Sequence, residues 1–170
     1  MARPRSDHSL RFEKTLRAAA APGAIPNVSD VDFSQIADLI PSTAIMDPNG
    51  EAFTLKFVRA GERLSRFFGR EAIGLDYLDF VDPAIKGEAF DAVFVMLSRP
   101  CGLWQITPCL TADGHSIAVE YTGFPIFDDK SGRGQIIFLI HHSLERVPLI
   151  VLVQHSTEWA WLEMRGAAPA

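Results

Sequence analysis

The chain has 170 residues, of which 48% are hydrophobic and 22% are charged, as expected for one globular domain with a short segment at each end. Its formal net charge of -5 disfavours nucleic acid as a partner. The N-terminus lacks the apolar core of a signal peptide, and the apolar run at 149–153 is too short to cross a bilayer. We therefore expect a cytoplasmic protein without a membrane span. Cys101 and Cys109 would lie roughly 26 Å apart in an extended segment, which is too far for a disulfide.

Two helical segments are predicted before the first strand. Apolar residues in 8–21 recur at helical spacing and place Phe12 and Leu16 on one stripe. A second, shorter helix is expected to begin after Asp32, which can cap its first turn, and to end at Pro41. These segments form a helical flank and linker over 1–41.

The middle of the chain begins with a hairpin and continues with helices. Strands are predicted at 43–46 and 51–58, joined by the turn Asp47-Pro48-Asn49-Gly50, and the second strand alternates apolar and polar residues. A helix follows at 61–68, and a longer helix is predicted at 84–98 after a proline suited to its first turn.

A second hairpin and a third strand follow. Strands at 103–110 and 116–127 are joined by the turn Asp113-Gly114, which is typical of hairpins. The strand at 135–142 is apolar without alternation, so both of its faces should be covered. In a single antiparallel sheet, the outer cover must come from a flank or a second subunit.

The C-terminal segment fits two structures. The apolar run at 149–153 suits a strand, whereas Leu152, Ser156, Trp159 and Leu162 have helical spacing. We predict a helix over 157–165, in which the tryptophans anchor the segment by packing.

The segment 43–142 resembles a PAS domain, and in particular the standalone single-domain PAS-like proteins common in alphaproteobacteria. The residues that carry the resemblance are Arg59-Ala60-Gly61, Leu64, Phe68-Gly69-Arg70-Glu71, Gly74, Tyr77-Leu78-Asp79-Phe80 and Pro100-Cys101-Gly102. The resemblance implies an α+β fold, with a five-stranded antiparallel sheet and helices on one face. It divides the chain into the flank 1–41, a PAS-like domain 42–144 and a C-terminal extension 145–170. It also implies a sensory or regulatory role and a tendency to form dimers.

The residues do not support a specific cofactor, metal or catalytic site. PAS domains that bind haem typically use a histidine on the long helix, and 84–98 has none. Covalent flavin binding needs a cysteine before that helix, whereas both cysteines follow it. His141 and His142 are adjacent on a strand and point to opposite faces, so they cannot share a metal ion. We predict no catalytic residue and no resident cofactor, while a noncovalently bound flavin or another small ligand remains open.

Two sets of site residues are predicted. The presumed pocket is lined by aromatic and large apolar side chains: Phe57, Leu64, Phe68, Phe90, Phe94, Trp104 and Tyr121. The same residues could instead fill a core without a ligand, because the chain has twelve phenylalanines. The surface for a partner or a second copy is predicted to comprise Phe12, Leu16, Ile136, Phe138 and Ile140.

Three functions follow from these patterns. The first is a bacterial regulatory protein that acts in trans by binding a signalling partner such as a histidine kinase, as a homodimer. The second is a receptor for a small ligand or a cofactor of the flavin or haem type. The third is a small α+β enzyme, which would need a buried acid-base pair that Glu88 and Asp91 on the long helix do not supply.

Overall fold

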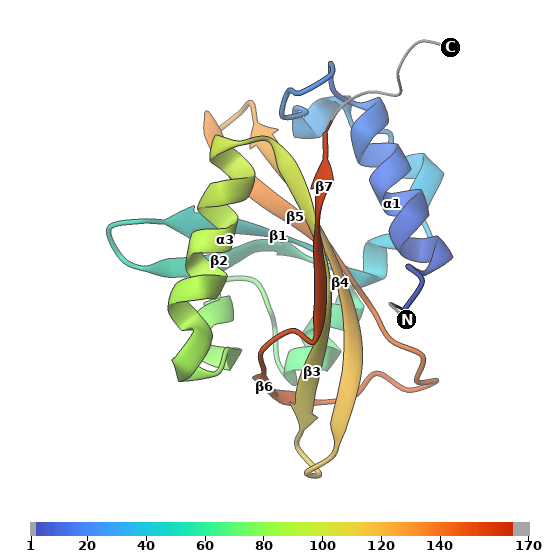
Figure 1. Ribbon diagram of the computed structural model, residues 1–170, viewed down its shortest axis with the longest axis vertical. Coiled ribbons are helices and arrows are strands. Elements are labelled where there is room, and N and C mark those ends of the chain that lie inside the picture. Colours follow the sequence, from blue (N-terminus) through green and yellow to red (C-terminus); the bar gives the residue numbers. More distant parts are fainter. Residues whose placement is uncertain (1–2, 165–170) are drawn as a thin grey trace.

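The computed structural model describes residues 3–164 and places one curved sheet between two helical layers (Figure 1). The helices are α1 (Asp7–Ala18), α2 (Glu62–Phe68) and α3 (Lys86–Ser98), with short 3-10 turns at η1 (Val28–Asp30), η2 (Phe33–Ile36), η3 (Ile40–Ser42), η4 (Tyr77–Phe80) and η5 (Pro83–Ile85). The strands are β1 (Thr43–Asn49), β2 (Thr54–Ala60), β3 (Cys101–Thr111), β4 (Ser116–Asp128), β5 (Arg133–His141), β6 (Ile150–Val153) and β7 (Glu158–Glu163). Within the described residues no helix is long and apolar enough to span a membrane.

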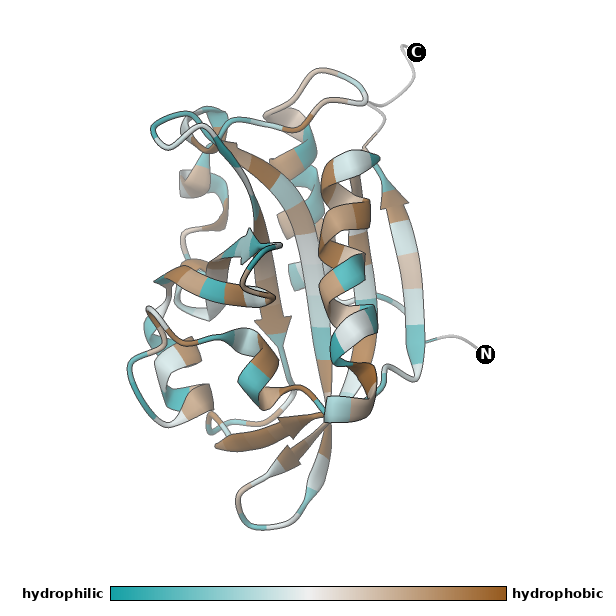
Figure 2. Ribbon diagram, turned by 90° about the vertical axis from the view of Figure 1, so that its left-hand side faces the viewer, coloured by the Kyte–Doolittle hydropathy of each residue, from teal (hydrophilic) through white to brown (hydrophobic). Residues whose placement is uncertain are grey.

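Five strands form the central sheet in the order β2-β1-β5-β4-β3, and every neighbouring pair is antiparallel. Helices α2 and α3 connect the β1–β2 hairpin to the β3–β4 hairpin and lie on one face. Figure 2, seen from the side of α3, shows hydrophobic segments on this helix and on the strands behind it. The strand number, pairing and helix placement confirm the PAS-like fold that the sequence predicts.

The C-terminal extension adds two strands to the free edge of β3. Strand β7 pairs with β3 from Cys101 to Ile106, and β6 pairs with it from Cys109 to Thr111. The predicted helix over 157–165 is therefore wrong for its described part, and Arg165 lies outside the described residues. The physical reason is the unpaired edge of β3, whose N–H and C=O groups are satisfied by a strand but not by a helix.

The inner face of the sheet packs against α2, η4 and α3. Its core contains buried side chains from β1, β2, β4 and β5, including Met46, Phe57, Tyr121 and Phe138, each less than a tenth exposed. Aromatic rings gather at the α2 end of this core, where the Phe68 ring centroid lies 5.4 Å from that of Phe57 and 4.4 Å from that of Phe80.

The outer face is covered by the N-terminal flank of the same chain. Phe12 and Leu16 of α1 are 0% exposed and pack in one cluster with Phe124, Ile137 and Leu139. This arrangement confirms that both faces of β5 are covered, and it identifies the flank as the outer cover.

The five residues predicted as a partner surface are all buried within the chain. Ile136, Phe138 and Ile140 point into the inner core, while their neighbours Ile137 and Leu139 meet α1. The prediction that Ile136, Phe138 and Ile140 form a partner surface is therefore wrong, because these side chains fill the core under α2 and α3. Phe12 and Leu16 do lie at the flank contact, but inside a single chain, so none of the five forms an exposed surface.

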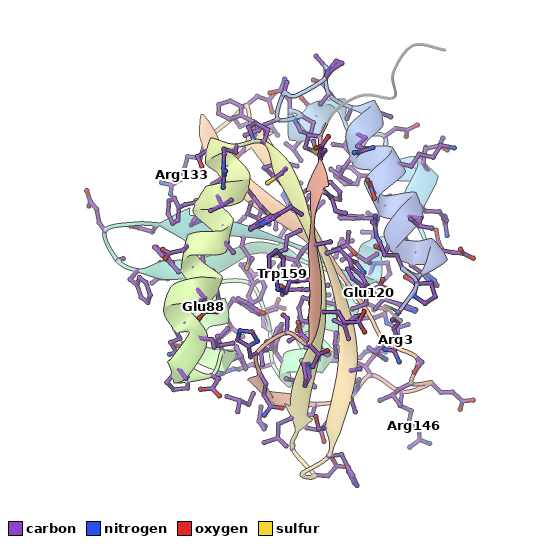
Figure 3. The ribbon with its side chains drawn as sticks, in the orientation of Figure 1. Arg3, Glu88, Glu120, Arg133, Arg146 and Trp159 are labelled. Carbon is purple, nitrogen blue, oxygen red and sulfur yellow. The ribbon has the colours of Figure 1, made fainter. Side chains whose placement is uncertain are left out.

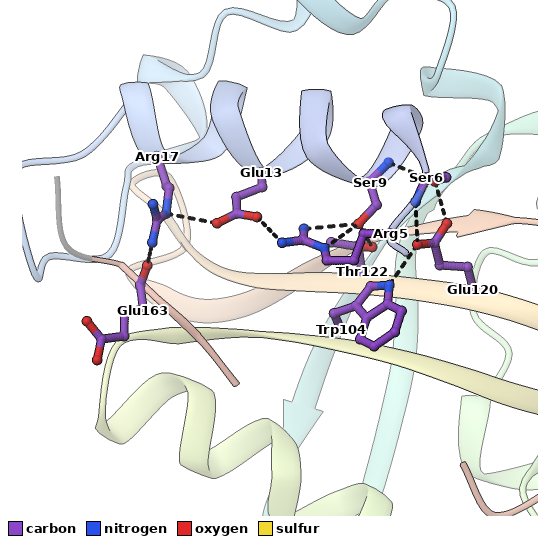
Figure 4. Close-up of polar contacts among 9 residues, drawn as sticks. All are labelled: Arg5, Ser6, Ser9, Glu13, Arg17, Trp104, Glu120, Thr122 and Glu163. Carbon is purple, nitrogen blue, oxygen red and sulfur yellow. Dashed lines mark hydrogen bonds and ion pairs between the residues drawn. The ribbon is translucent and has the colours of Figure 1, made fainter. Parts of the chain in front are cut away.

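A polar network fastens α1 to the outer face (Figure 4). Glu120, only 7% exposed, accepts hydrogen bonds from the Trp104 indole N–H at 2.7 Å, from the Ser6 backbone N–H at 3.1 Å and from the Ser6 hydroxyl. Farther along the helix, the Ser9 and Thr122 hydroxyls hydrogen-bond at 2.7 Å. Because Ser6 also caps the start of α1, the carboxylate lies where the helix dipole favours negative charge.

Candidate ligand site

A cavity of about 270 Å³ lies between α3 and the inner face of the sheet. The helix contributes small or flexible side chains, among them Ala89, Ala92 and Met96, and β4 contributes Gly123. The aromatic rings of Phe57, Phe68 and Phe80 gather at the α2 end of the core and do not line this cavity. The volume lies just below the ~300–1,000 Å³ that is typical of small-molecule sites.

The inner end of the cavity is neutral. The Tyr121 hydroxyl lies 3.7 Å from the Cys109 sulfur, and Tyr77 lies beside both groups. Burial raises the pKa of the Cys109 thiol to about 12. It also raises the pKa values of the Tyr77 and Tyr121 hydroxyls well above the ordinary value for tyrosine. Tyr77 and Tyr121 line the cavity, whereas Cys109 does not, so at neutral pH this end offers uncharged hydroxyl groups on an apolar wall.

The rim of the cavity is completed by the C-terminal extension. His155 Nε2 lies 3.4 Å from Glu88 Oε2 on α3, so this pair links the extension to the helix. The hydroxyls of Thr107 on β3 and Ser156 hydrogen-bond at 2.9 Å. Trp159 lies on the α3 side of β7, on the opposite side of the sheet from Glu120 (Figure 3).

One further polar group faces the cavity from β3. The Gln105 side chain lines the wall, and its amide makes no hydrogen bond with any residue in the described range 3–164. The amide carries both donors and an acceptor, so it can pair with either kind of ligand group.

The predicted pocket residues fall in several places. Tyr121 lines the cavity, whereas Phe57, Leu64 and Phe68 pack inside the core beside it. Phe90 is buried against Phe53 and Phe94, whereas Phe94 is 38% exposed, and neither ring lines the cavity.

Trp104 lies on the other face of the sheet, where its indole N–H is bound to Glu120. Its neighbours Leu103 and Gln105 face the cavity instead, as the alternation of a strand requires. Trp104 is therefore excluded from the pocket.

The pocket predicted from the sequence includes neither the C-terminal extension nor the small residues of α3. The apolar residues at 159–162 form a short continuous run between Glu158 and Glu163, which suits a strand as well as a buried helix segment. A cavity beside small residues leaves no comparable mark in one sequence.

The described residues contain neither a disulfide nor a cluster of metal-ligating side chains. Cys101 and Cys109 are free thiols. Among residues 3–164 no group of three or more histidine, cysteine or acidic side chains is placed to hold a metal ion. His141 stacks on His8 of α1 with ring centroids 4.3 Å apart.

Comparison with known proteins identifies structural neighbours only. No family model matches the chain, and no curated protein matches it. The Vibrio cholerae VqmA dimer in the absence of target DNA is 19% identical with a TM-score of 0.48, over 69% of this chain and 55% of that chain. A second VqmA structure, bound to DPO, is covered over 59% of its length, so this chain spans less than two thirds of either VqmA chain.

Two isolated domains are also similar. The PAS domain of a Colwellia psychrerythraea protein is 15% identical with a TM-score of 0.46, over 67% of this chain and 98% of that chain. The LOV domain of the blue-light photoreceptor Aureochrome1 is 16% identical with a TM-score of 0.46, over 72% of this chain and 88% of that chain. At these scores none of the neighbours decides what the cavity binds.

Proposed function

We propose that this chain is a sensory module whose cavity between α3 and the sheet binds a small molecule, and that occupancy controls its contact with a signalling protein. The observation that carries the proposal is the unfilled cavity, with an uncharged inner end and a polar rim. This combination of an apolar wall and a few converging polar groups is characteristic of ligand sites.

The cavity favours a receptor over an adaptor with a filled core. Twelve phenylalanines are enough to fill a core of this size, but many of their rings gather elsewhere, around α2 and in the cluster under α1. An enzymatic role is not part of the proposal, because the acidic group and histidine that meet at the rim, Glu88 and His155, are both largely exposed to solvent.

For the partner and the cellular location we keep the proposals made from the sequence. We place the module in the cytoplasm, acting on a signalling protein such as a histidine kinase, as a homodimer. The surfaces available for such contacts include the exposed side chains of β6 and β7, among them Val151 and Trp159.

Native mass spectrometry of the freshly purified protein tests the proposal, with the denatured mass as reference. We expect extra mass that disappears on denaturation. Ala92→Phe, which places a ring in the cavity, should abolish the extra mass, whereas Ala112→Phe makes the same change in the exposed β3–β4 turn and should keep it. A mass equal to that of the bare chain in all three proteins would contradict the proposal. The same spectrum gives the oligomeric state.

A further inference from the structure

The rim of the cavity carries acidic rather than basic charge. Glu88 is the carboxylate that lines it, and His155 is charged only when it is protonated. Among the described residues, no lysine or arginine lines the cavity. An anionic ligand would therefore lack the guanidinium or ammonium partner that usually binds a carboxylate or phosphate.

Two exposed indoles lie at the same rim. Trp159 and Trp161 are 59% and 41% exposed, although tryptophan is highly buried on average in folded proteins. Their ring centroids are 6.1 Å apart with an angle of 73° between the planes, so one ring presents its edge to the other.

The strand register directs both indoles to the cavity. Trp159 lies opposite Gln105 and Trp161 lies opposite Leu103, and both of these β3 residues face the cavity. Two approximately perpendicular rings that line the same cavity as a carboxylate can contact an organic cation, because the faces of the rings are electron-rich.

The inner end sets a different requirement. It is apolar, and the hydroxyl groups of Tyr77 and Tyr121 are uncharged at neutral pH, so a charge placed there would be desolvated without a counter-ion. A ligand that satisfies both ends has an apolar part inside and its charge at the rim.

We propose that the cavity binds a small amphipathic amine, whose apolar end enters between α3 and the sheet and whose ammonium group lies at the rim between Glu88 and the indoles of Trp159 and Trp161. This inference rests on the proposed function, since it names the ligand class of the same cavity. His155 contacts Glu88 in the free protein, and the ammonium group takes over that contact.

Three probes that share a phenyl ring and a two-carbon chain test the class. They are phenethylamine, which is cationic at pH 7.5, 2-phenylethanol, which is neutral, and phenylacetate, which is anionic. Binding to the full chain is measured by calorimetry and by tryptophan fluorescence. We expect the amine to bind about tenfold more tightly than the alcohol, and the acid to bind most weakly.

Two variants locate the effect at the rim. Glu88→Gln should reduce the preference for the amine over the alcohol without changing the affinity for the alcohol, and Trp159→Ala should weaken binding of the amine more than binding of the alcohol. Both side chains are exposed, so neither change should unfold the protein. Glu62→Gln, which removes one exposed carboxylate on α2 away from the cavity, is the matched control and should change nothing.

The outcomes separate this inference from the proposed function. Equal binding of amine and alcohol, or an amine preference that Glu88→Gln leaves unchanged, would overturn the inference and leave the receptor function intact. Binding of none of the three probes would also overturn the inference, and the native mass spectrum would then decide the receptor function separately. An amine preference that is reduced in Glu88→Gln and kept in Glu62→Gln supports the inference.

Discussion

Replacing Glu120 by alanine should loosen the N-terminal flank and lower the free energy of unfolding by about 2–5 kcal/mol. The buried bond from the Trp104 indole to the carboxylate is worth about 1.5–3 kcal/mol, because a hydrogen bond to a charged group is stronger than a neutral one. The bond from the Ser6 backbone N–H is part-buried and adds about 0.5–1.5 kcal/mol. The negative charge of Glu120 at the start of α1 also interacts favourably with the helix dipole, which adds at least about 0.3 kcal/mol.

The assay is urea unfolding followed by fluorescence and circular dichroism, together with hydrogen exchange of the α1 amides. We expect α1 to lose protection before the central strands do. Glu51→Ala is the control, since Glu51 lies exposed in the β1–β2 turn and should change the stability by less than about 0.5 kcal/mol. A loss below about 1 kcal/mol for Glu120→Ala, with α1 protection unchanged, would refute the role assigned to the carboxylate.

Three further perturbations have defined outcomes. Gly61→Ala should cost about 1–3 kcal/mol in urea unfolding, because its new Cβ would lie 2.3 Å from the backbone oxygen of Ile40; wild-type stability would show that this approach is not tight. Phe12→Ala should cost about 3–5 kcal/mol, since its ring is fully buried under the outer face, and a cost below 1 kcal/mol, roughly that of a surface change, would mean that the flank is not docked there. Burial lowers the pKa of His141 and His142, so the unfolded chain binds more protons below pH ~6.5; the melting temperature should fall as the pH drops from 7.5 to 5.5, and a flat profile would contradict the burial of these rings.

The order of elements was predictable because local signals agree with the tertiary structure. The turns at Asn49-Gly50 and Asp113-Gly114, the alternation in β2 and the single proline before α3, Pro83, each indicate a boundary close to the observed one. The apolar run of β5 also predicted correctly that both of its faces are covered. The run could not show which residues face α3 and which face α1. Ile136 and Ile137 are equally apolar, and a shift of the strand register by one residue would exchange the faces they occupy.

The extension and the cavity depend on contacts between distant parts of the chain. The segment around Trp159 suits a strand or a helix by local pattern, and the unpaired edge of β3 decides between them. The sequence predicts a pocket lined mainly by large aromatic side chains. In the structure most of these rings pack against one another, and the cavity lies beside Ala92 and Gly123 instead. Empty volume is a property of the packed chain, so it leaves no periodic signal in the sequence.

The most direct test of the receptor function is a methyl spectrum of the methionines by nuclear magnetic resonance. The sequence has four methionines, of which Met46 and Met96 line the cavity and Met164 lies in the outer cluster under α1. The protein as purified is compared with the same sample after denaturation, removal of small molecules and refolding. We expect the Met46 and Met96 signals to shift while the Met164 signal stays in place. Identical spectra before and after refolding, with native mass spectra that show only the bare chain, would contradict it.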